Sequence, residues 1–241
     1  MDRITLSVKK IIFQPLKEVG AIIFPECCLF CKSELTTNEK HVCGLCELEL
    51  KRTYFEDFKE SSALDKLFWG RVKLEKTFAL YYFNSETAIR EMLHQLKYQH
   101  KEKLGIDLGK KIGLTLKQSA LFSDLDALIP VPIHHKKEFI RGYNQSELLA
   151  RGINSELGVS IIKNKTSKRK HTSSQTKKSN QERWENVATV FQSQDLSEYK
   201  HVALVDDVIT TGSTIESLAN ELLKSNEHLK ISVISLAFAQ S

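Results

Sequence analysis

The sequence predicts an α/β protein in which a mainly parallel sheet is flanked by helices and is preceded by a small cysteine-rich module. Three observations support this prediction. From residue 77 onward, short runs rich in Val and Ile alternate with amphipathic segments of helical length. Two closely spaced cysteine pairs lie near the start of the chain. Finally, an apolar strand over 202–205 runs into two adjacent carboxylates and a turn rich in Thr and Ser.

Composition restricts the class of protein. The chain has 241 residues, of which 41% are hydrophobic and 27% charged, as in a globular protein with a substantial core. A net charge of +5 is compatible with phosphate or nucleic-acid ligands but does not require them. Residues 1–24 are expected to form a helical segment. Charged residues interrupt their apolar runs, so neither a signal peptide nor a membrane span is predicted, and a cytoplasmic location is expected.

Residues 25–50 are predicted to form a zinc-binding module, because they contain two C-x-x-C hooks. Four thiolates suit tetrahedral zinc, and a site closed by four sulfurs would be structural rather than catalytic. Disulfides or free thiols are the alternatives, although a reducing cytosol disfavours disulfides. Cys27 could replace the first hook residue, and His41 could replace another. The expected zinc ligands are Cys28, Cys31, Cys43 and Cys46.

The remaining chain is divided into a connector over 51–76, which carries scattered aromatic residues, and an α/β domain over 77–241. Alternating strands and helices imply parallel pairing with right-handed crossovers, and ligands then bind at the carboxyl ends of the strands. Strands are expected over 78–83, 125–133, 159–162, 202–205 and 231–239, and helices over 88–96, 104–116, 148–157 and 213–223.

The stretch after the strand at 202–205 predicts a site for a ribose phosphate. The start of the next helix offers unpaired backbone N–H groups and the positive end of a dipole, which suit a phosphate, and Gly212 lets the backbone approach closely. Asp206 and Asp207 would repel a phosphate but suit sugar hydroxyls or a hydrated magnesium ion. An ordinary helix cap is the alternative, and it would leave the two acids unexplained. Hydroxyl donors come from Thr210, Thr211, Ser213 and Thr214.

A second loop should face the same crevice, because it follows the strand that ends at Pro132. It is rich in basic and amide side chains, including Lys137, Arg141, Asn144 and Gln145. Fixed cations beside a ribose phosphate would stabilise the charge that grows on a departing pyrophosphate. A solvated basic loop is the alternative.

A third segment, over 164–181, is polar and rich in lysine. Three interpretations fit this composition: a mobile surface loop, a nucleic-acid contact, or a loop that closes over a substrate and keeps water from a reactive ribosyl centre.

The stretch from Val202 to Thr214 closely resembles the 5-phosphoribosyl 1-pyrophosphate (PRPP) signature of type I phosphoribosyltransferases. The resemblance implies a type I phosphoribosyltransferase fold in which Asp206 and Asp207 hold the ribose 2- and 3-hydroxyls and residues 210–214 wrap the 5-phosphate. Neither G-x-x-x-x-G-K-[ST] nor G-x-G-x-x-G occurs in the chain. Gly105, Gly109 and Lys110 come nearest to the former motif, with a spacing that is one residue short.

Further motifs are the cysteine hooks, Leu96-Lys97-Tyr98, Pro130-Val131-Pro132, Arg141-Gly142-Tyr143-Asn144-Gln145, Gln175, Arg183, Asn186 and Asp206. Together they narrow the resemblance to the ComF family, which comprises phosphoribosyltransferase-like proteins associated with competence and DNA uptake. Many members carry a second pair of cysteine hooks, which is missing over 51–76, so a single zinc is expected. Relatives that salvage purines have an acid at the position of Thr210, so a purine acceptor is not expected.

The resemblance implies a protein that binds PRPP together with magnesium. As an enzyme, it would transfer the phosphoribosyl group to an acceptor that the sequence does not identify, with Asp206, Asp207 and Arg141 as its catalytic residues. Asp206 and Asp207 would also hold the magnesium. The alternative is a non-catalytic protein of the DNA-uptake machinery that handles single-stranded DNA or acts as an adaptor for other competence proteins.

Overall fold

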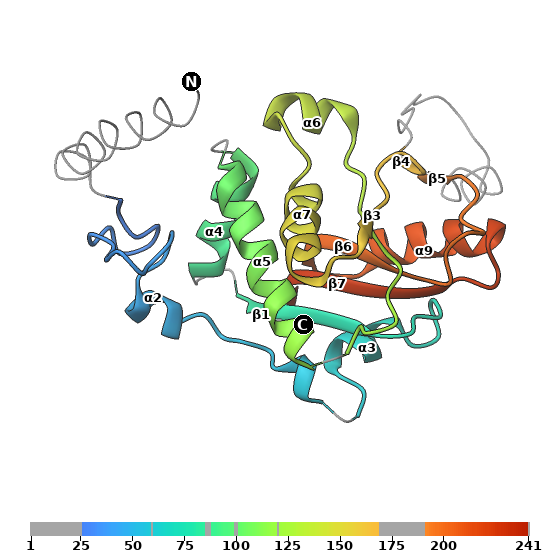
Figure 1. Ribbon diagram of the computed structural model, residues 1–241, viewed down its shortest axis with the longest axis horizontal. Coiled ribbons are helices and arrows are strands. Elements are labelled where there is room, and N and C mark those ends of the chain that lie inside the picture. Colours follow the sequence, from blue (N-terminus) through green and yellow to red (C-terminus); the bar gives the residue numbers. More distant parts are fainter. Residues whose placement is uncertain are drawn as a thin grey trace, which may run out of the picture. The chain divides into compact units, whose positions relative to one another are not determined.

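The computed structural model describes residues 26–58, 60–84, 88–98, 101–119, 121–168 and 191–240 (Figure 1). The predicted helical segment over 1–24 lies outside these residues. The chain divides into two compact units, Met1–Leu50 and Lys51–Ser241. Among the described residues, no helix is both long enough and apolar enough to cross a membrane.

The first unit is built from turns around one short helix, α2 (Gly44–Leu48). Lys32 and His41 both adopt left-handed backbone conformations, which let the chain reverse direction tightly beside each cysteine hook. Cys28, Cys43 and Cys46 are buried together with only a few aliphatic side chains. Because this apolar core is so small, burial alone provides little stabilisation for the unit.

The second unit contains the predicted parallel sheet. Within the described residues, five strands pair in the order β1-β7-β6-β2-β3, and every pair is parallel. The predicted α/β class, with a mainly parallel sheet flanked by helices, is therefore confirmed. The strands are β1 (Thr77–Phe83), β2 (Ala127–Pro130), β3 (Ser160–Ile161), β6 (His201–Ile209) and β7 (Lys230–Ala239).

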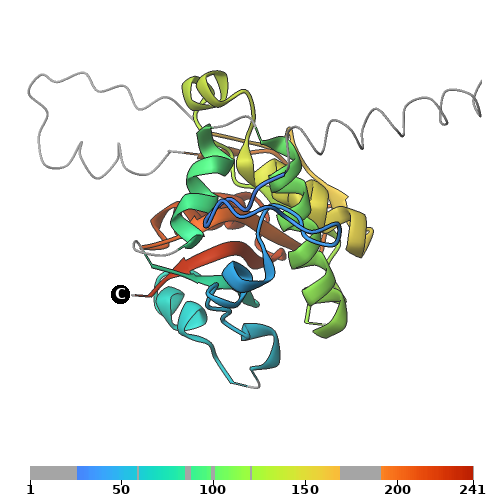
Figure 2. The ribbon, with the colours of Figure 1, turned by 90° about the vertical axis from the view of Figure 1, so that its left-hand side faces the viewer.

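Helices cover both faces of this sheet. The connections from β1 to β2 and from β2 to β3 run across the sheet in one direction, and their right-handed crossovers put α5 and α7 on one face. The connection from β6 to β7 runs in the opposite direction, so it puts α9 on the other face (Figure 2). The long helices are α4 (Ala88–Tyr98), α5 (Glu102–Ser119), α7 (Gln145–Leu157) and α9 (Ser213–Ser225). All four match helices expected from the apolar periodicity, because each buries one apolar face.

Glycines allow α5 and α7 to pack at close range. A Cβ atom on Gly109 would lie 2.2 Å from the carbonyl oxygen of Leu149, and one on Gly152 would lie 2.1 Å from that of Ile106. Both distances are far inside van der Waals contact, so the two helix backbones touch directly. The resemblance of Gly105 and Gly109 to a phosphate-binding motif is thus coincidental, since these residues form a packing face.

The central strand β6 is longer than the sequence predicts. It continues through Asp206 and Asp207 to Ile209, because β7 goes on pairing with it as far as Ile209 opposite Phe238. On the other side, pairing with β2 stops where Pro130 lies opposite Val205. The two acids are therefore held on a strand that extends beyond its shorter neighbour, and the prediction that the strand ends before them was wrong.

Several short elements were not predicted. The basic loop after β2 contains a helix, α6 (His135–Arg141), which ends at Gly142 in a left-handed conformation. Residues 164–168, expected to be loop, include β4 (Thr166–Lys168), which pairs antiparallel with β5 (Phe191–Ser193). The connector contains the 3-10 helix η1 (Phe55–Asp57) and α3 (Ala63–Phe68), which begins with a capping box formed by Ser62 and Asp65.

Candidate functional site

A cavity of about 260 Å³ lies at the carboxyl end of β6 in the second unit. Its walls come from the extended end of β6, the loop and helix α6 that follow β2, and the first residues of α7 and α9. The single residues Lys97 and Lys168 complete it from α4 and β4. Of the predicted site residues, the cavity brings together Pro132, Lys137, Arg141, Gln145, Asp206, Asp207 and Thr214.

The two acids have different partners. The Nζ atom of Lys97 lies 2.8 Å from Oδ2 of Asp207. Asp206 accepts hydrogen bonds at Oδ1 from the Ser146 hydroxyl at 3.2 Å and from the Asp207 backbone N–H at 2.9 Å. Burial and the adjacent Asp207 charge nevertheless raise the pKa of Asp206 to about 7. Near neutral pH this carboxyl group can therefore both donate and accept hydrogen bonds.

Cations outnumber acids around the cavity. Among the described lining residues, Lys97, Lys137, Arg141 and Lys168 face two carboxylates. Burial lowers the pKa of Lys168, and the nearby positive charge of Lys137 acts in the same direction. Such an excess of positive charge in a concave, partly buried site favours an anionic ligand.

Arg141 is held in place by its neighbours. Its Nη1 atom donates to Oε1 of Gln145 at 2.7 Å, and its guanidinium lies 5.4 Å from the centre of the Tyr98 ring. These contacts hold the guanidinium at the wall of the cavity. Because the side chain is already ordered, it loses little conformational entropy when it binds a ligand.

The Thr- and Ser-rich turn leads into α9 as predicted. Gly212 is the N-cap residue, with φ of +73°, and Thr211 and Ser213 exchange a hydroxyl hydrogen bond of 3.0 Å. Thr214 lines the cavity, so the N-terminal end of α9 opens towards it. Thr210, Thr211, Gly212 and Ser213 are not among the residues that line it.

Residues of the predicted connector hold this turn from behind. A Cβ atom on Gly212 would lie 2.7 Å from Cε1 of Phe68, so only glycine lets the turn pack against that ring. Arg71 donates from Nη1 to the carbonyl oxygen of Thr211 at 2.8 Å and pairs with Glu216 at 2.5 Å. The connector is thus part of the framework of the site.

One predicted ligand residue has a structural role. Asn144 caps α7 by accepting from the backbone N–H of Ser146 at 3.0 Å, and its amide nitrogen donates to the carbonyl oxygen of Val131 at 3.0 Å. Its side chain lines a neighbouring cavity of about 340 Å³ instead. Asn144 therefore ties the loop after β2 to the start of α7.

Lys97 and Ser146 were not predicted as site residues. Each lies on an amphipathic helix, where a polar residue ordinarily faces solvent, and only the topology brings it to the acids. Leu96-Lys97-Tyr98 did stand out as a family motif, and this was the one available signal. Gln175, Arg183 and Asn186, which belong to the same resemblance, lie outside the described residues.

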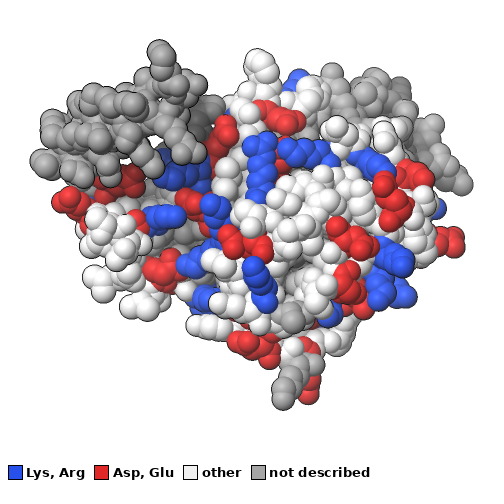
Figure 3. Space-filling model, viewed as in Figure 1, with Lys and Arg blue, Asp and Glu red and all other residues white. Residues whose placement is uncertain are grey.

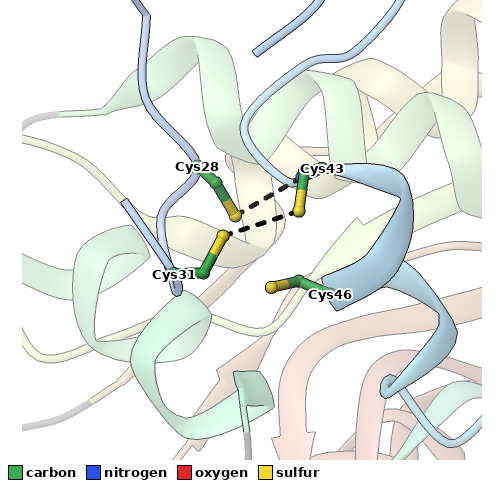
Figure 4. Close-up of side chains that lie close together, drawn as sticks. All are labelled: Cys28, Cys31, Cys43 and Cys46. Carbon is green, nitrogen blue, oxygen red and sulfur yellow. Dashed lines mark hydrogen bonds between the residues drawn. The ribbon is translucent and has the colours of Figure 1, made fainter. Parts of the chain in front are cut away.

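The first unit contains the predicted cysteine cluster. The sulfur atoms of Cys28, Cys31, Cys43 and Cys46 all lie within 4.8 Å of one another and could hold a metal ion (Figure 4). Cys31 and Cys43 approach to 3.6 Å, and the backbone N–H of Cys43 donates to the Cys28 sulfur. Cys27 and His41 are not in this cluster. No disulfide bond joins any of the five cysteines, all of which lie in the described part of the chain.

The donor set fits zinc. Tetrahedral Zn–S bonds of about 2.3 Å place sulfurs about 3.8 Å apart, close to the separation already present. Hydrogen bonds from Ser33 lower the pKa of Cys31 to about 6, whereas burial and the neighbouring thiols raise the pKa of Cys46 to about 12. Metal ions bind the thiolate form, so metal binding would displace a proton from Cys46.

Comparisons with known proteins agree with the sequence resemblance. No family model matches the chain. The chain is 32% identical over 139 residues to competence protein F of Haemophilus influenzae, covering 55% of the chain and 61% of that protein. It is 27% identical over 137 residues to the DNA utilization protein YhgH of Escherichia coli K12, covering 56% of the chain and 60% of that protein. It is 24% identical over 221 residues to competence protein ComFC of Bacillus subtilis, covering 87% of the chain and 82% of that protein.

Proposed function

Given that the chain belongs to the ComF family, we propose that it binds PRPP with magnesium at the cavity beside β6 and serves competence or DNA utilisation as a phosphoribosyltransferase. The observation that carries this proposal is the cavity itself, where two acids on the end of β6 face a cluster of cations and the N-terminal end of α9. The acids suit ribose hydroxyls, and the cations suit pyrophosphate.

In this proposal, different residues around the cavity bind different parts of PRPP. Asp206 and Asp207 orient the ribose, Thr214 and the start of α9 receive the 5-phosphate, and Lys137, Arg141 and Lys168 hold the pyrophosphate. The donor set also fits magnesium, because Asp206 and Asp207 supply the carboxylate oxygens it prefers. A magnesium ion bound there would neutralise charge on the pyrophosphate.

In the transfer step, the bond between the anomeric carbon and the pyrophosphate oxygen breaks, and the electron pair leaves with that oxygen. A new bond forms between the anomeric carbon and the acceptor nucleophile, whose proton passes to solvent. Arg141 and Lys137 stabilise the growing negative charge, so catalysis comes from positioning and electrostatics.

Calorimetric titration with PRPP and magnesium tests this proposal. We expect micromolar binding, and a loss of affinity of at least about 100-fold in the double variant Asp206→Asn, Asp207→Asn, because neutral amides replace the two carboxylates that accept from the ribose hydroxyls and suit magnesium. The matched control is Asp57→Asn, Asp195→Asn, which removes the same charge from two exposed positions outside the cavity. Equal affinity in the two double variants, or no binding by the folded parent protein, would contradict the proposal.

For the first unit, we propose that Cys28, Cys31, Cys43 and Cys46 bind one structural zinc ion, since they leave no coordination position open for a substrate. Zinc content measured by atomic emission should fall from one per chain to near zero in Cys46→Ser. Cys27→Ser is the matched control and should keep its zinc, because Cys27 lies outside the cluster. Loss of zinc from both variants alike would show that the cluster is wrongly assigned.

A second candidate function rests on the surface of α6. This helix buries none of its residues; Phe139 is 90% exposed and Ile140 is 71% exposed. Lys136, Lys137 and Arg141 lie on the same helix, and a row of Lys and Arg side chains crosses the face between α6 and the β4–β5 ribbon (Figure 3). Exposed aromatic rings flanked by cations suit single-stranded DNA, which stacks its bases and pairs its phosphates.

Fluorescence anisotropy with a labelled oligothymidylate separates the two functions. If α6 binds DNA, Phe139→Ala should weaken binding about 10-fold, because stacking contributes roughly 1–3 kcal/mol per base. Leu114→Ala, at a 48% exposed position on α5, should leave binding unchanged. If Phe139→Ala and Leu114→Ala had the same affinity for DNA, α6 would not be the DNA-binding surface.

A further inference from the structure

A third cavity, of about 830 Å³, lies among residues 55–77 of the second unit. In Figure 1 these residues lie below the sheet, on the side opposite α6. The volume falls within the range of small-molecule sites, roughly 300–1,000 Å³. Neither the proposed PRPP site nor the cysteine cluster uses this cavity.

Aromatic rings dominate the apolar part of its wall. Phe55 and Phe68 are buried, whereas Phe58 is 50% exposed and Trp69 is 63% exposed. Phe58 also meets Phe55 edge to face, with ring centroids 5.5 Å apart. Rings of this size are normally covered by protein, so two of them left open on one concave surface suggest a planar ligand that stacks on them.

The charges around this cavity cancel. Several are already paired, because Arg71 binds Glu216 at 2.5 Å and Asp65 accepts from the Thr77 hydroxyl at 2.7 Å. Lys76 donates to the carbonyl oxygen of Leu121 at 2.8 Å. A site with balanced charge favours an uncharged ligand over a phosphorylated one. The charged lining residues are Arg71, Lys73 and Lys76 against Glu60, Asp65 and Glu75.

We propose that this cavity binds a neutral nucleoside or its free base. The rings of Phe58 and Trp69 supply stacking surfaces, and the hydroxyl of Ser61 with the charged groups of Glu60 and Lys73 supplies donors and acceptors for the polar edge of a base. A purely aliphatic ligand would leave these polar groups unpaired.

The cavity is connected to the turn over 210–214. Phe68 and Arg71 line the cavity, and the same two side chains pack against Gly212 and donate to the carbonyl oxygen of Thr211. A ligand that moves either side chain therefore alters the turn. This coupling rests on the proposed PRPP function, whereas nucleoside binding itself does not.

NMR of the full, zinc-loaded chain tests binding directly. The protein has two tryptophans, Trp69 and Trp184, whose indole N–H signals are distinguished by the variant Trp184→Phe. Titration with adenosine and with thymidine should shift the Trp69 signal in a saturable way, with a dissociation constant of about millimolar or tighter. The affinity should fall at least about five-fold in Phe58→Ser, because one stacking surface is lost.

Two controls locate the site. Phe139→Ser removes an exposed ring outside the cavity and should keep the parent affinity. The double variant Asp206→Asn, Asp207→Asn should also keep it, which excludes binding at the proposed PRPP site. The assignment would be overturned if the Trp69 signal did not move, or if Phe58→Ser kept the parent affinity. It would also be overturned if neither nucleoside shifted the signal but a tyrosine-containing peptide, titrated in the same way, did.

The coupling has its own readout. PRPP affinity measured with and without saturating adenosine should differ about two- to ten-fold, and adenosine affinity should change by the same factor when PRPP is present. If PRPP fails to bind at all, the proposed function falls while the Trp69 titration still decides the nucleoside site. If PRPP binds and Trp69 does not respond, only the nucleoside site falls.

Discussion

Two neighbouring acids on β6 face different surroundings. Asp207 is paired with Lys97, whereas Asp206 is buried against Ser146 and carries a pKa raised to about 7. In the proposed function this difference is useful, because a partly protonated carboxyl group can donate one hydrogen bond to a ligand while its ion-paired neighbour only accepts.

The raised pKa of Asp206 predicts how stability depends on pH. Between the ordinary value for Asp and about 7, the folded state holds a proton that the unfolded state has released, so the free energy of unfolding falls as pH rises through this window. Without magnesium, urea unfolding should show a loss of about 2 kcal/mol from pH 5 to pH 8. Asp206→Asn should largely remove this loss, since it cannot ionise.

The control is Asp195→Asn. Hydrogen bonds from Ser197 hold the pKa of this exposed carboxyl group below its usual value, so its contribution disappears only at more acidic pH. This variant should therefore keep the parent slope between pH 5 and pH 8. If the free energy of unfolding of Asp206→Asn fell with pH as steeply as that of the parent protein, another group would be responsible for the pH dependence.

Individual site residues were only partly predictable. Asp206, Asp207 and Thr214 line the cavity and stand close together in sequence, so a local pattern could indicate them. Lys97 comes from a helix far along the chain, and Lys168 comes from a strand that no periodicity indicates. Asn144 carried the right functional groups for a ligand contact, but both ends of its amide bond protein backbone.

At the scale of elements, close packing of α5 on α7 makes a strong prediction. Gly152→Ala should lower the free energy of unfolding by about 2–3 kcal/mol, because the added methyl group would lie 2.1 Å from a carbonyl oxygen and the helices must separate. Lys117→Ala on α5 serves as a control and should change stability little, since this position is exposed. Urea denaturation at one pH gives both values. Equal free energies of unfolding for Gly152→Ala and Lys117→Ala would mean that α5 and α7 can separate without loss of stability.

Long elements were predicted well, and short ones were not. Each long helix has enough turns for its apolar face to recur, and each core strand forms a continuous apolar run. In contrast, α6 buries no residue, so hydrophobic periodicity cannot reveal it. The β4–β5 ribbon joins segments separated by a long stretch of sequence and contributes only three residues on each side. Its pairing depends on tertiary contacts.

At the scale of the whole molecule, the two units should respond differently to metal removal. The first unit has few buried aliphatic side chains besides its cysteines, whereas the second has an extensive core beneath its sheet. A zinc chelator should therefore abolish amide protection over 26–50 and leave β6 and β7 protected. Hydrogen exchange measured by mass spectrometry checks this. Equal loss of protection in both units would show that they unfold together.

The sheet order puts β1 beside β7, although about 150 residues separate them in the chain. Until Lys230–Ala239 has been synthesised, β1 and β6 each lack a neighbour and expose an open, apolar edge. A chain still held by the ribosome short of this point cannot complete its sheet, whatever helices it has formed. Premature termination anywhere before residue 230 should thus yield an aggregating product rather than a smaller active protein, and nascent chains should depend on chaperones until synthesis is almost finished.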